Sequence, residues 1–561
     1  MRKSGMSTPF PQAEDHTLKG ATREPGGDPA RSQTLSMSGN HLYRSWEISS
    51  APDEGTSGGA GKGNRTPAIE ADEKSDAPIV LKKLPNKGGR AGKPAGEPAE
   101  AVEGRGAAKG NTGEFTAGRT PSRETALTGL ERVRETAQQD RRLKFTALLH
   151  HITPSLLVDS FYDLKRNAAA GVDGVTWQDY ENILYGRVHE LHRQIHTGAY
   201  RAQASRRVYI AKADGKLRPL GIAAVEDKIV QQAVVKVLSA IYETDFLGFS
   251  YGFRPGRGQH DALDAVWMGI STRHIGWILD ADISAYFDTI DHDWMLKFLE
   301  HRIADKRLLR LITKWLKAGI IEDGKRIASE RGTPQGAVIS PLLANIYLHY
   351  VFDTWAHHWR THQAGGDVIL IRYADDSVLG FQYEDEAKRF LADLQERLAQ
   401  FGLTLHPQKT RLIEFGRYAE KRRKKRGLGK PETFDFLGFT HCCAKTRQGK
   451  FKILRLTVKK RLRATLAAIR ETLKRRRHEP IGQVGAWLTK VMRGYYNYFA
   501  VPGNLQRLGG FRHEVARAWR AALSRRSQKG EMTWARLSRL AEQYLPYPKR
   551  VHPYPEQRFA S

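Results

Sequence analysis

The sequence has few cysteines, no long apolar run and a shortage of acidic residues. Only Cys442 and Cys443 are present among 561 residues, which excludes a disulfide framework and any cysteine-rich zinc module. Two thiols in a chain of this length are typical of a reducing cytoplasm. No apolar stretch is long enough to span a bilayer, and no signal-like apolar segment follows the basic start. We therefore expect a cytoplasmic protein that has no membrane partner.

The deficit of acidic residues gives the chain a large positive charge. Lys and Arg number 91 against 61 Asp and Glu, a formal net charge of +30. Charge of this size says little about fold, but it favours a polyanionic partner such as nucleic acid. Such binding would weaken steeply with salt because bound counterions are released.

The length is enough for several domains, and the composition changes along the chain. Residues 1–120 are rich in Gly, Pro, Ala, Ser and charged residues. Such a segment buries too little apolar surface to offset its ordering entropy, so we expect a disordered extension. It is either a solvated tail or an arm that contacts RNA.

Apolar residues at helical spacing begin near Ser122 and recur through the rest of the chain. The expected helices include 125–134, its continuation at 145–152, 155–165, 177–196, 226–242, one starting at Ser340-Pro341, and a basic helical region from Val458. The basic run 418–430 is expected to be a loop.

Residues 206–222 predict a β-hairpin, because two short strands flank an Asp-Gly turn. Lys212 and Arg218 belong to a group of basic side chains on this hairpin. Such a group either solvates one face or holds phosphates.

A second hairpin is predicted at 365–381, with Asp375 and Asp376 in its turn. Adjacent carboxylates repel each other, and a cation such as Mg²⁺ relieves that repulsion. A solvated turn is the alternative. The apolar run 277–283 predicts a strand that ends at Asp282. Asp282 is either a metal ligand or a helix cap.

Several motifs occur in an order that resembles the reverse transcriptases of bacterial mobile group II introns, which also act as maturases. The resemblance covers roughly residues 125 to 555. The motifs are the Asp282–Phe287 segment, Gly332-Thr333-Pro334-Gln335-Gly336 with Ser340-Pro341-Leu342, Tyr373-Ala374-Asp375-Asp376, Gly402 to Thr410, and Phe434 to Phe439.

The resemblance implies two-metal dNTP addition templated by RNA. Asp282, Asp375 and Asp376 would be catalytic, and with the Ile283 carbonyl they would bind two Mg²⁺ ions. Lys212, Arg218, Phe287, Gln335 and Lys409 would contact the nucleotide, with Phe287 as a gate against ribonucleotides and Lys409 as a general acid. Phe436, Leu437, Gly438 and Phe439 would hold the primer. Asp280, Asp288 and Asp291 are expected to lie outside the metal site.

The implied fold is α+β: a right-hand polymerase with fingers and an antiparallel palm sheet, followed by an α-helical thumb or maturase domain. The expected boundaries are a disordered extension at 1–120, fingers and palm at 121–440, a helical thumb at 441–530, and a short basic tail at 531–561. Because paired cysteines are lacking, we expect no HNH nuclease.

The implied function is that of an RNA-directed DNA polymerase from a mobile element, with maturase activity that assists splicing. The implied partners are group II intron RNA, an RNA template with its DNA primer, target DNA and dNTPs. Two alternatives stay open: an RNA-binding maturase that does not polymerise, and a domesticated reverse transcriptase that serves defence or diversification.

Overall fold

The computed structural model describes residues 121–211, 217–526 and 532–559. All of them belong to one compact unit, Ile69–Ser561. The expected extension at 1–120, and Lys212 in the first hairpin, lie outside the described residues. No helix among the described residues combines the length and the apolarity that crossing a membrane requires.

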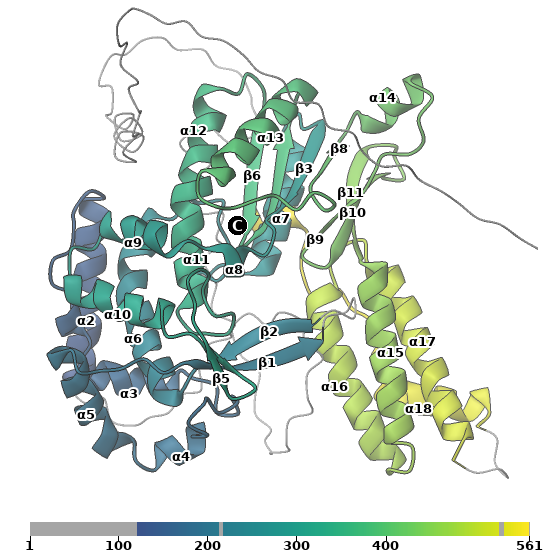
Figure 1. Cartoon of the computed structure of the whole chain (residues 1–561). Coiled ribbons are helices and arrows are strands. Elements are labelled where there is room, and N and C mark those ends of the chain that lie inside the picture. Colours follow the sequence, from purple (N-terminus) through teal and green to yellow (C-terminus); the bar gives the residue numbers. More distant parts are fainter. Residues whose placement is uncertain (1–120, 212–216, 527–531, 560–561) are drawn as a thin grey trace, which may run out of the picture. The chain divides into compact units, whose positions relative to one another are not determined.

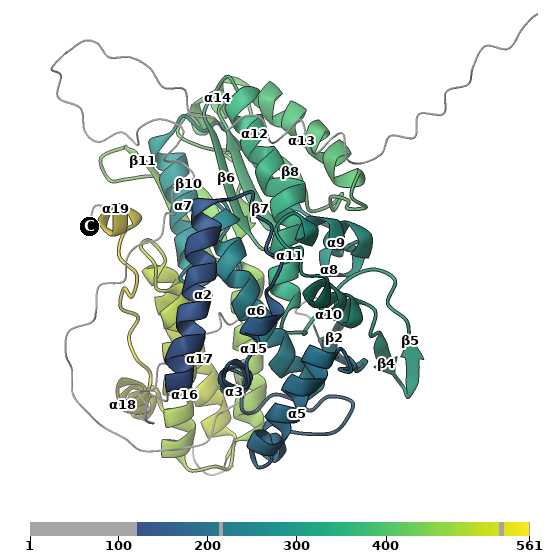
Figure 2. The same cartoon turned by 90° about the vertical axis from the view of Figure 1, so that its left-hand side faces the viewer.

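The N-terminal part of the described chain is helical and is organised around α6, Val225–Asp245. Helix α6 is buried along most of its length, and α2 and α3 pack against it (Figure 2). The preceding helices are α2 Pro121–Gln139, η2 Leu149–His151, α3 Pro154–Tyr162, α4 Trp177–Glu181 and α5 Leu184–Thr197.

Two helix predictions in this region are wrong. Residues 145–152 do not continue the first helix, because Phe145 forms backbone hydrogen bonds with the 302–304 segment and only η2 is helical. The helix expected at 177–196 is two helices, α4 and α5, interrupted at Asn182-Ile183. A capping box of Thr176 and Asp179 begins α4.

The two strands of the predicted basic hairpin pair as expected in a four-stranded sheet of order β2-β1-β4-β5, while its Asp-Gly turn lies outside the described residues. Strands β1, Ser205–Ala211, and β2, Leu217–Ile222, pair antiparallel, while β1 pairs in parallel with β4. The other strands are β4 Ile320–Glu322 and β5 Lys325–Ile327.

The central sheet is antiparallel and has the order β6-β7-β3-β8 (Figure 1). The predicted hairpin at 365–381 is confirmed as β6–β7, and every residue of β6 is buried. Helix α7 packs Gly269 against Ile369 of β6, whereas α13 packs Phe390 against Phe381 of β7. The strands are β3 Trp277–Asp282, β6 Val368–Tyr373, β7 Asp376–Phe381 and β8 Arg411–Glu414, with helices α7 Gln259–Thr272 and α13 Glu384–Ala399.

Short helices connect and support the two sheets. They are α8 Tyr286–Thr289, α9 His292–Glu300, α10 Lys306–Leu316, α11 Ser340–Leu348, the π-helical segment η3 His349–Asp353, and α12 Thr354–His362. The predicted start of α11 at Ser340-Pro341 is confirmed, with Pro341 in the first turn, where its missing N–H leaves no hydrogen bond unmade.

The third sheet has the order β11-β10-β9, formed by β9 Phe434–Phe436, β10 Phe439–Lys445 and β11 Phe451–Thr457. Residues 418–430 are not simply a loop, because they contain helix α14, Ala419–Lys425. Arg422 and Arg426 of this segment both pair with the buried Glu414 of β8. Part of the basic run therefore neutralises a buried carboxylate.

The C-terminal part is mainly helical: α15 Lys459–Arg475, α16 Ile481–Phe499, α17 Leu505–Ser524, α18 Trp534–Tyr544 and α19 Pro555–Phe559. Leu537 and Leu545 are buried with the residues of α16 and α17, so the 532–545 segment shares their core. The short helix α19 reaches α7, where Arg558 pairs with Asp261 and Asp264.

Candidate active site

Three aspartates from two segments of the chain meet at one end of the central sheet. Asp282, the last residue of β3, lies directly opposite Asp376, the first residue of β7. Asp375 precedes Asp376 in the turn after β6. One carboxylate oxygen from each of the three lies within 4.8 Å of the others, and all three side chains are half-buried. Among the residues that the structure describes, no other cluster of three potential metal-ligating side chains is found.

The turn that carries Asp375 is tight and locally strained. Tyr373 pairs with Asp376, so Ala374 and Asp375 alone connect the two strands. Ala374 has a φ of 57°, which is unfavourable for a residue with a side chain. The backbone of Gly252 packs so closely that a Cβ there would lie 2.3 Å from the Ala374 nitrogen. The turn is thus held by its surroundings rather than by its own sequence preference.

The carboxylate cluster is partly neutralised by a lysine. Lys409 Nζ donates a hydrogen bond to Asp282 Oδ2, and the lysine itself is exposed. Asp280, on the same strand face, forms a looser ion pair with Arg411 at 3.7 Å. Burial raises the pKa of Asp280 to about 7, and the nearby Asp376 and Asp282 add to that rise. This end of the sheet therefore concentrates negative charge, and hard oxygen ligands at such a site fit a divalent cation.

The segment after Asp282 is fixed by pairing with the 404–406 segment. Ser284 N donates to Thr404 O, and His406 N donates to Asp282 O. Neither bond uses the Ile283 carbonyl, the oxygen expected to be a ligand. The same pairing sets the position of Lys409, three residues after His406.

Phe287 lies on the short helix α8 and is half-buried. The buried Tyr286 anchors this helix because its hydroxyl donates to Ala344 O at 2.6 Å. The Phe287 carbonyl accepts a hydrogen bond from Thr333 N at 2.8 Å. Phe287 is therefore tied directly to the loop that carries Gln335.

The Gln335 loop is attached to β2. Gly221 N donates to Gln335 O at 2.6 Å, and Gly336 has a φ of 112°. A Cβ on Gly336 would lie 2.8 Å from the Gly221 carbonyl oxygen, so only glycine fits there. Because Arg218 is on the same strand, this bond joins the strand of Arg218 to the loop of Gln335.

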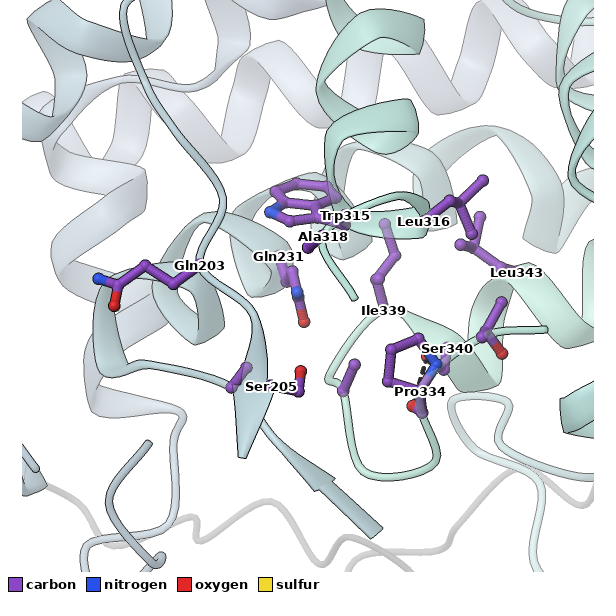
Figure 3. A pocket seen from close by; sticks show the side chains of 13 residues that line it. Gln203, Ser205, Gln231, Trp315, Leu316, Ala318, Pro334, Ile339, Ser340 and Leu343 are labelled. Carbon is purple, nitrogen blue, oxygen red and sulfur yellow. Dashed lines mark hydrogen bonds between the residues drawn. The ribbon is translucent and has the colours of Figure 1, made fainter. Parts of the chain in front are cut away.

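A small cavity lies behind this loop, among Gln203, Ser205, Gln231 and Trp315 (Figure 3). Its volume of about 10 Å³ is room for about one water molecule. The cavity is therefore no substrate site. Gln231 Oε1 accepts a hydrogen bond from Val338 N at 3.0 Å, which anchors the loop to α6.

Of the four expected primer-holding residues, Leu437 and Gly438 form the two-residue turn between β9 and β10, and Phe436 and Phe439 are the paired strand residues on either side of it. Leu437 and Gly438 have φ values of 46° and 84°, as a type I′ hairpin turn requires. The Tyr498 hydroxyl donates to Leu437 O at 2.7 Å, which fastens the hairpin to α16.

A buried ion pair that the sequence does not predict lies beside the aspartates. Arg372 of β6 and Asp353 of η3 are almost fully buried and pair at 2.5 Å. The signal was an arginine inside the apolar strand VILIRY, since a buried charge needs a partner. Nothing in the sequence identified Asp353 as that partner.

Comparison with known proteins agrees with the motifs. The family described as "Reverse transcriptase (RNA-dependent DNA polymerase)" matches residues 210–441. The chain is 40% identical over 229 residues to Protein YkfC of Escherichia coli, covering 39% of this chain and 60% of that protein. It is 36% identical over 225 residues to the group II intron-encoded protein LtrA of Lactococcus lactis, covering 39% of this chain and 37% of LtrA.

More distant similarity extends to yeast. The chain is 34% identical over 185 residues to a putative COX1/OXI3 intron 2 protein of Saccharomyces cerevisiae, covering 33% of this chain and 21% of that protein. The matched regions span no more than 60% of these three relatives. The resemblance to group II intron reverse transcriptases is confirmed.

Proposed function

Since residues 210–441 belong to the reverse transcriptase family, we propose that this chain is the RNA-directed DNA polymerase and maturase of a mobile group II intron. The observation that carries the proposal is the meeting of Asp282, Asp375 and Asp376 at one end of the central sheet. An RNA chaperone has no need of three clustered carboxylates, which repel one another without a cation. The maturase that does not polymerise is disfavoured for this reason.

Asp282 and Asp375 would hold two Mg²⁺ ions, with Asp376 and the Ile283 carbonyl completing the set of oxygen ligands. When bound, such ions neutralise charge on the attacking and leaving oxygens of a phosphoryl transfer. The protein's own part is to hold the primer 3′-hydroxyl and the α-phosphate of a dNTP in line. Lys409, already beside Asp282, would donate a proton to the leaving pyrophosphate.

The nucleotide would lie between the Gln335 loop, helix α8 and β2. Gln335 would pack on the base, and the Phe287 ring would clash with a ribose 2′-hydroxyl. Arg218, with Lys212 of the same hairpin, would bind the triphosphate through charge-assisted hydrogen bonds. The backbone bonds among these three elements support the grouping.

The template, primer and intron RNA would be bound largely through their backbones. The net charge of +30 supports binding to a polyanion. We propose fingers and palm at about 121–440 and a thumb in the helices that follow. Helices of this kind grip an A-form duplex by shape and phosphate contact. The Phe436–Phe439 segment would hold the primer. Target DNA would be a further partner when the intron moves to a new site.

Primer extension by the purified chain tests this proposal. An RNA template with an annealed DNA primer, dNTPs and Mg²⁺ should give full-length cDNA, and EDTA should abolish it. A self-splicing assay at low Mg²⁺ with a group II intron RNA tests the maturase activity separately. No extension on RNA under any divalent cation would refute the polymerase, whatever the splicing result.

A further inference from the structure

We propose that Arg372 is a positioning residue that sets Asp375 in the metal site, with Asp353 as the counter-charge that fixes Arg372. This inference rests on the proposed function, because it concerns how the same carboxylates are aimed. The two residues lie behind the turn and are not metal ligands themselves. Arg372 is 1% exposed and Asp353 is 0% exposed, so solvent does not compete for their hydrogen bonds.

The guanidinium of Arg372 uses all five of its N–H donors. Two donate to the Asp353 carboxylate, from Nε at 2.7 Å and from Nη2 at 2.5 Å. Nη2 also donates to Ser250 Oγ at 2.7 Å, and Nη1 donates to Asn345 Oδ1 at 3.1 Å. The fifth bond runs from Nη1 to the carbonyl of Ala374 at 2.9 Å.

The bond to the Ala374 carbonyl connects the Arg372 network to Asp375. The Ala374 carbonyl belongs to the peptide that joins Ala374 to Asp375, so its orientation determines where the Asp375 side chain begins. That peptide follows a residue with a φ of 57°, a conformation that persists only where its surroundings enforce it. The planar guanidinium donates its hydrogen bonds in fixed directions, which the flexible ammonium group of a lysine cannot reproduce.

The segment 249–252 also packs against this turn. Tyr251 N donates to Arg372 O at 2.9 Å, and Arg372 N donates to Phe249 O at 2.9 Å. Asn345 Nδ2 donates to Gly252 O at 2.7 Å, which holds Gly252 against the Ala374 nitrogen. The turn is therefore fixed between the Gly252 backbone and the Arg372 side chain.

The position of Asp353 depends on an irregular helix. Residues His349–Asp353 are π-helical, and the Thr354 N–H donates to the His349 carbonyl five residues earlier. Such single-turn widening is frequent at functional sites. Here it lies between α11, which supplies Asn345, and α12, and it carries the carboxylate that Arg372 needs.

A purely structural role is the competing explanation, because removing one member of a buried pair leaves an uncompensated charge. Two variants separate the explanations. R372K keeps the charge opposite Asp353 but loses the fork that reaches Ala374. R372M/D353L removes both charges, a change that often leaves stability intact, and it also removes the donor to Ala374.

The matched controls change a buried Arg–Asp pair away from the turn. Arg302 and Asp245 are similarly buried and pair at 3.0 Å, and the Arg302 guanidinium bonds backbone carbonyls at the end of α2. The change in unfolding temperature of R302K should match that of R372K, and the change for R302M/D245L should match that of R372M/D353L. They should keep the wild-type rate and the wild-type response to metal.

The measurements are thermal unfolding, RNA binding, single-turnover nucleotide addition over a range of Mg²⁺, and direct Mn²⁺ binding by electron paramagnetic resonance. For folded R372K and R372M/D353L we expect a rate loss of about 100-fold and weaker Mn²⁺ binding, with RNA binding unchanged. Wild-type rate and Mn²⁺ affinity in either folded variant would overturn the inference. If the wild-type chain itself adds no nucleotide, the proposed function fails instead, and the Mn²⁺ data still test the positioning.

Discussion

The ammonium group of Lys409 lies against the carboxylate of Asp282, in the same cluster that would bind a divalent cation. Lys409 thus places positive charge beside the three aspartates. A metal ion that binds Asp282 must compete with this contact. Lys409, which is exposed, would then be available to the pyrophosphate end of a nucleotide.

Replacement of Lys409 by Met should separate these two roles. We expect single-turnover addition to slow by about 10²-fold, because a positioned proton donor is lost. The Mg²⁺ concentration for half-maximal rate should fall, because the competing cation is gone. Single-nucleotide addition measured across Mg²⁺ concentrations checks both effects. An unchanged rate would remove Lys409 from the chemistry.

Replacement of Phe287 by Ala should admit ribonucleotides. The backbone of Phe287 is held by α8 and by the bond from Thr333 N, so a gating ring at this position would be carried on a fixed backbone. We expect discrimination between dNTP and rNTP to fall, mainly because the KM for the ribonucleotide becomes lower. Competition between the two nucleotides on one template gives the ratio. If the ratio stays at the wild-type value, Phe287 is not the gate.

Replacement of Arg218 by Gln should weaken nucleotide binding more than it slows chemistry. Arg218 is on β2, the strand that also bonds the Gln335 loop through Gly221. Losing a charge-assisted contact made equally in ground and transition states raises KM and leaves kcat nearly unchanged. We expect KM for dNTP to rise about tenfold. A fall in kcat with unchanged KM would contradict this assignment.

Replacement of His441 by Phe should reduce the sensitivity of stability to acid. Burial lowers the pKa of His441 to about 3, and the nearby Arg455 adds to the effect. In the unfolded chain the pKa is about 6.5, so only the unfolded chain takes up this proton between the two values. The stability linked to His441 is therefore present above pH 6.5 and is lost as the pH falls toward 3.

On acidification from pH 6.5 toward pH 3, the free energy of unfolding should fall in wild type by about 1.4 kcal/mol per pH unit more than it falls in H441F. The fully buried ring of His441 stacks on Phe434 at 4.6 Å between ring centroids, so a Phe ring fits the same place. Urea unfolding at pH 5 and pH 7.5 makes the comparison. An equal loss in wild type and variant would contradict the linkage.

The parts of the site that sequence predicted are those encoded by short local patterns. Asp375 and Asp376 lie in a turn between two apolar runs, and Asp282 ends a third, so each could be placed on its element. Their convergence could not be derived from spacing, because the register of β3 against β7 depends on the whole sheet. It was anticipated only through family resemblance.

The predictions that were wrong also depend on contacts between segments that are distant in sequence. The break between α4 and α5 and the helix within 418–430 depend on tertiary packing, which overrides local propensity. Arg422 is an example, because it reads as surface charge but pairs with the buried Glu414. Arg372 could be recognised as unusual in an apolar strand. Four of its five bonds go to residues 19 to 122 positions away in the sequence, so its role required the structure.

The central claim is that the aspartate cluster is a polymerase site, and replacement of Asp375 by Asn tests it most directly. Asp385, an exposed residue in the first turn of α13, provides the matched control. We predict that D375N makes no cDNA on a primed RNA template while binding that template as tightly as wild type. D385N should extend the primer normally. Primer extension by D375N at a rate near that of wild type would contradict the account.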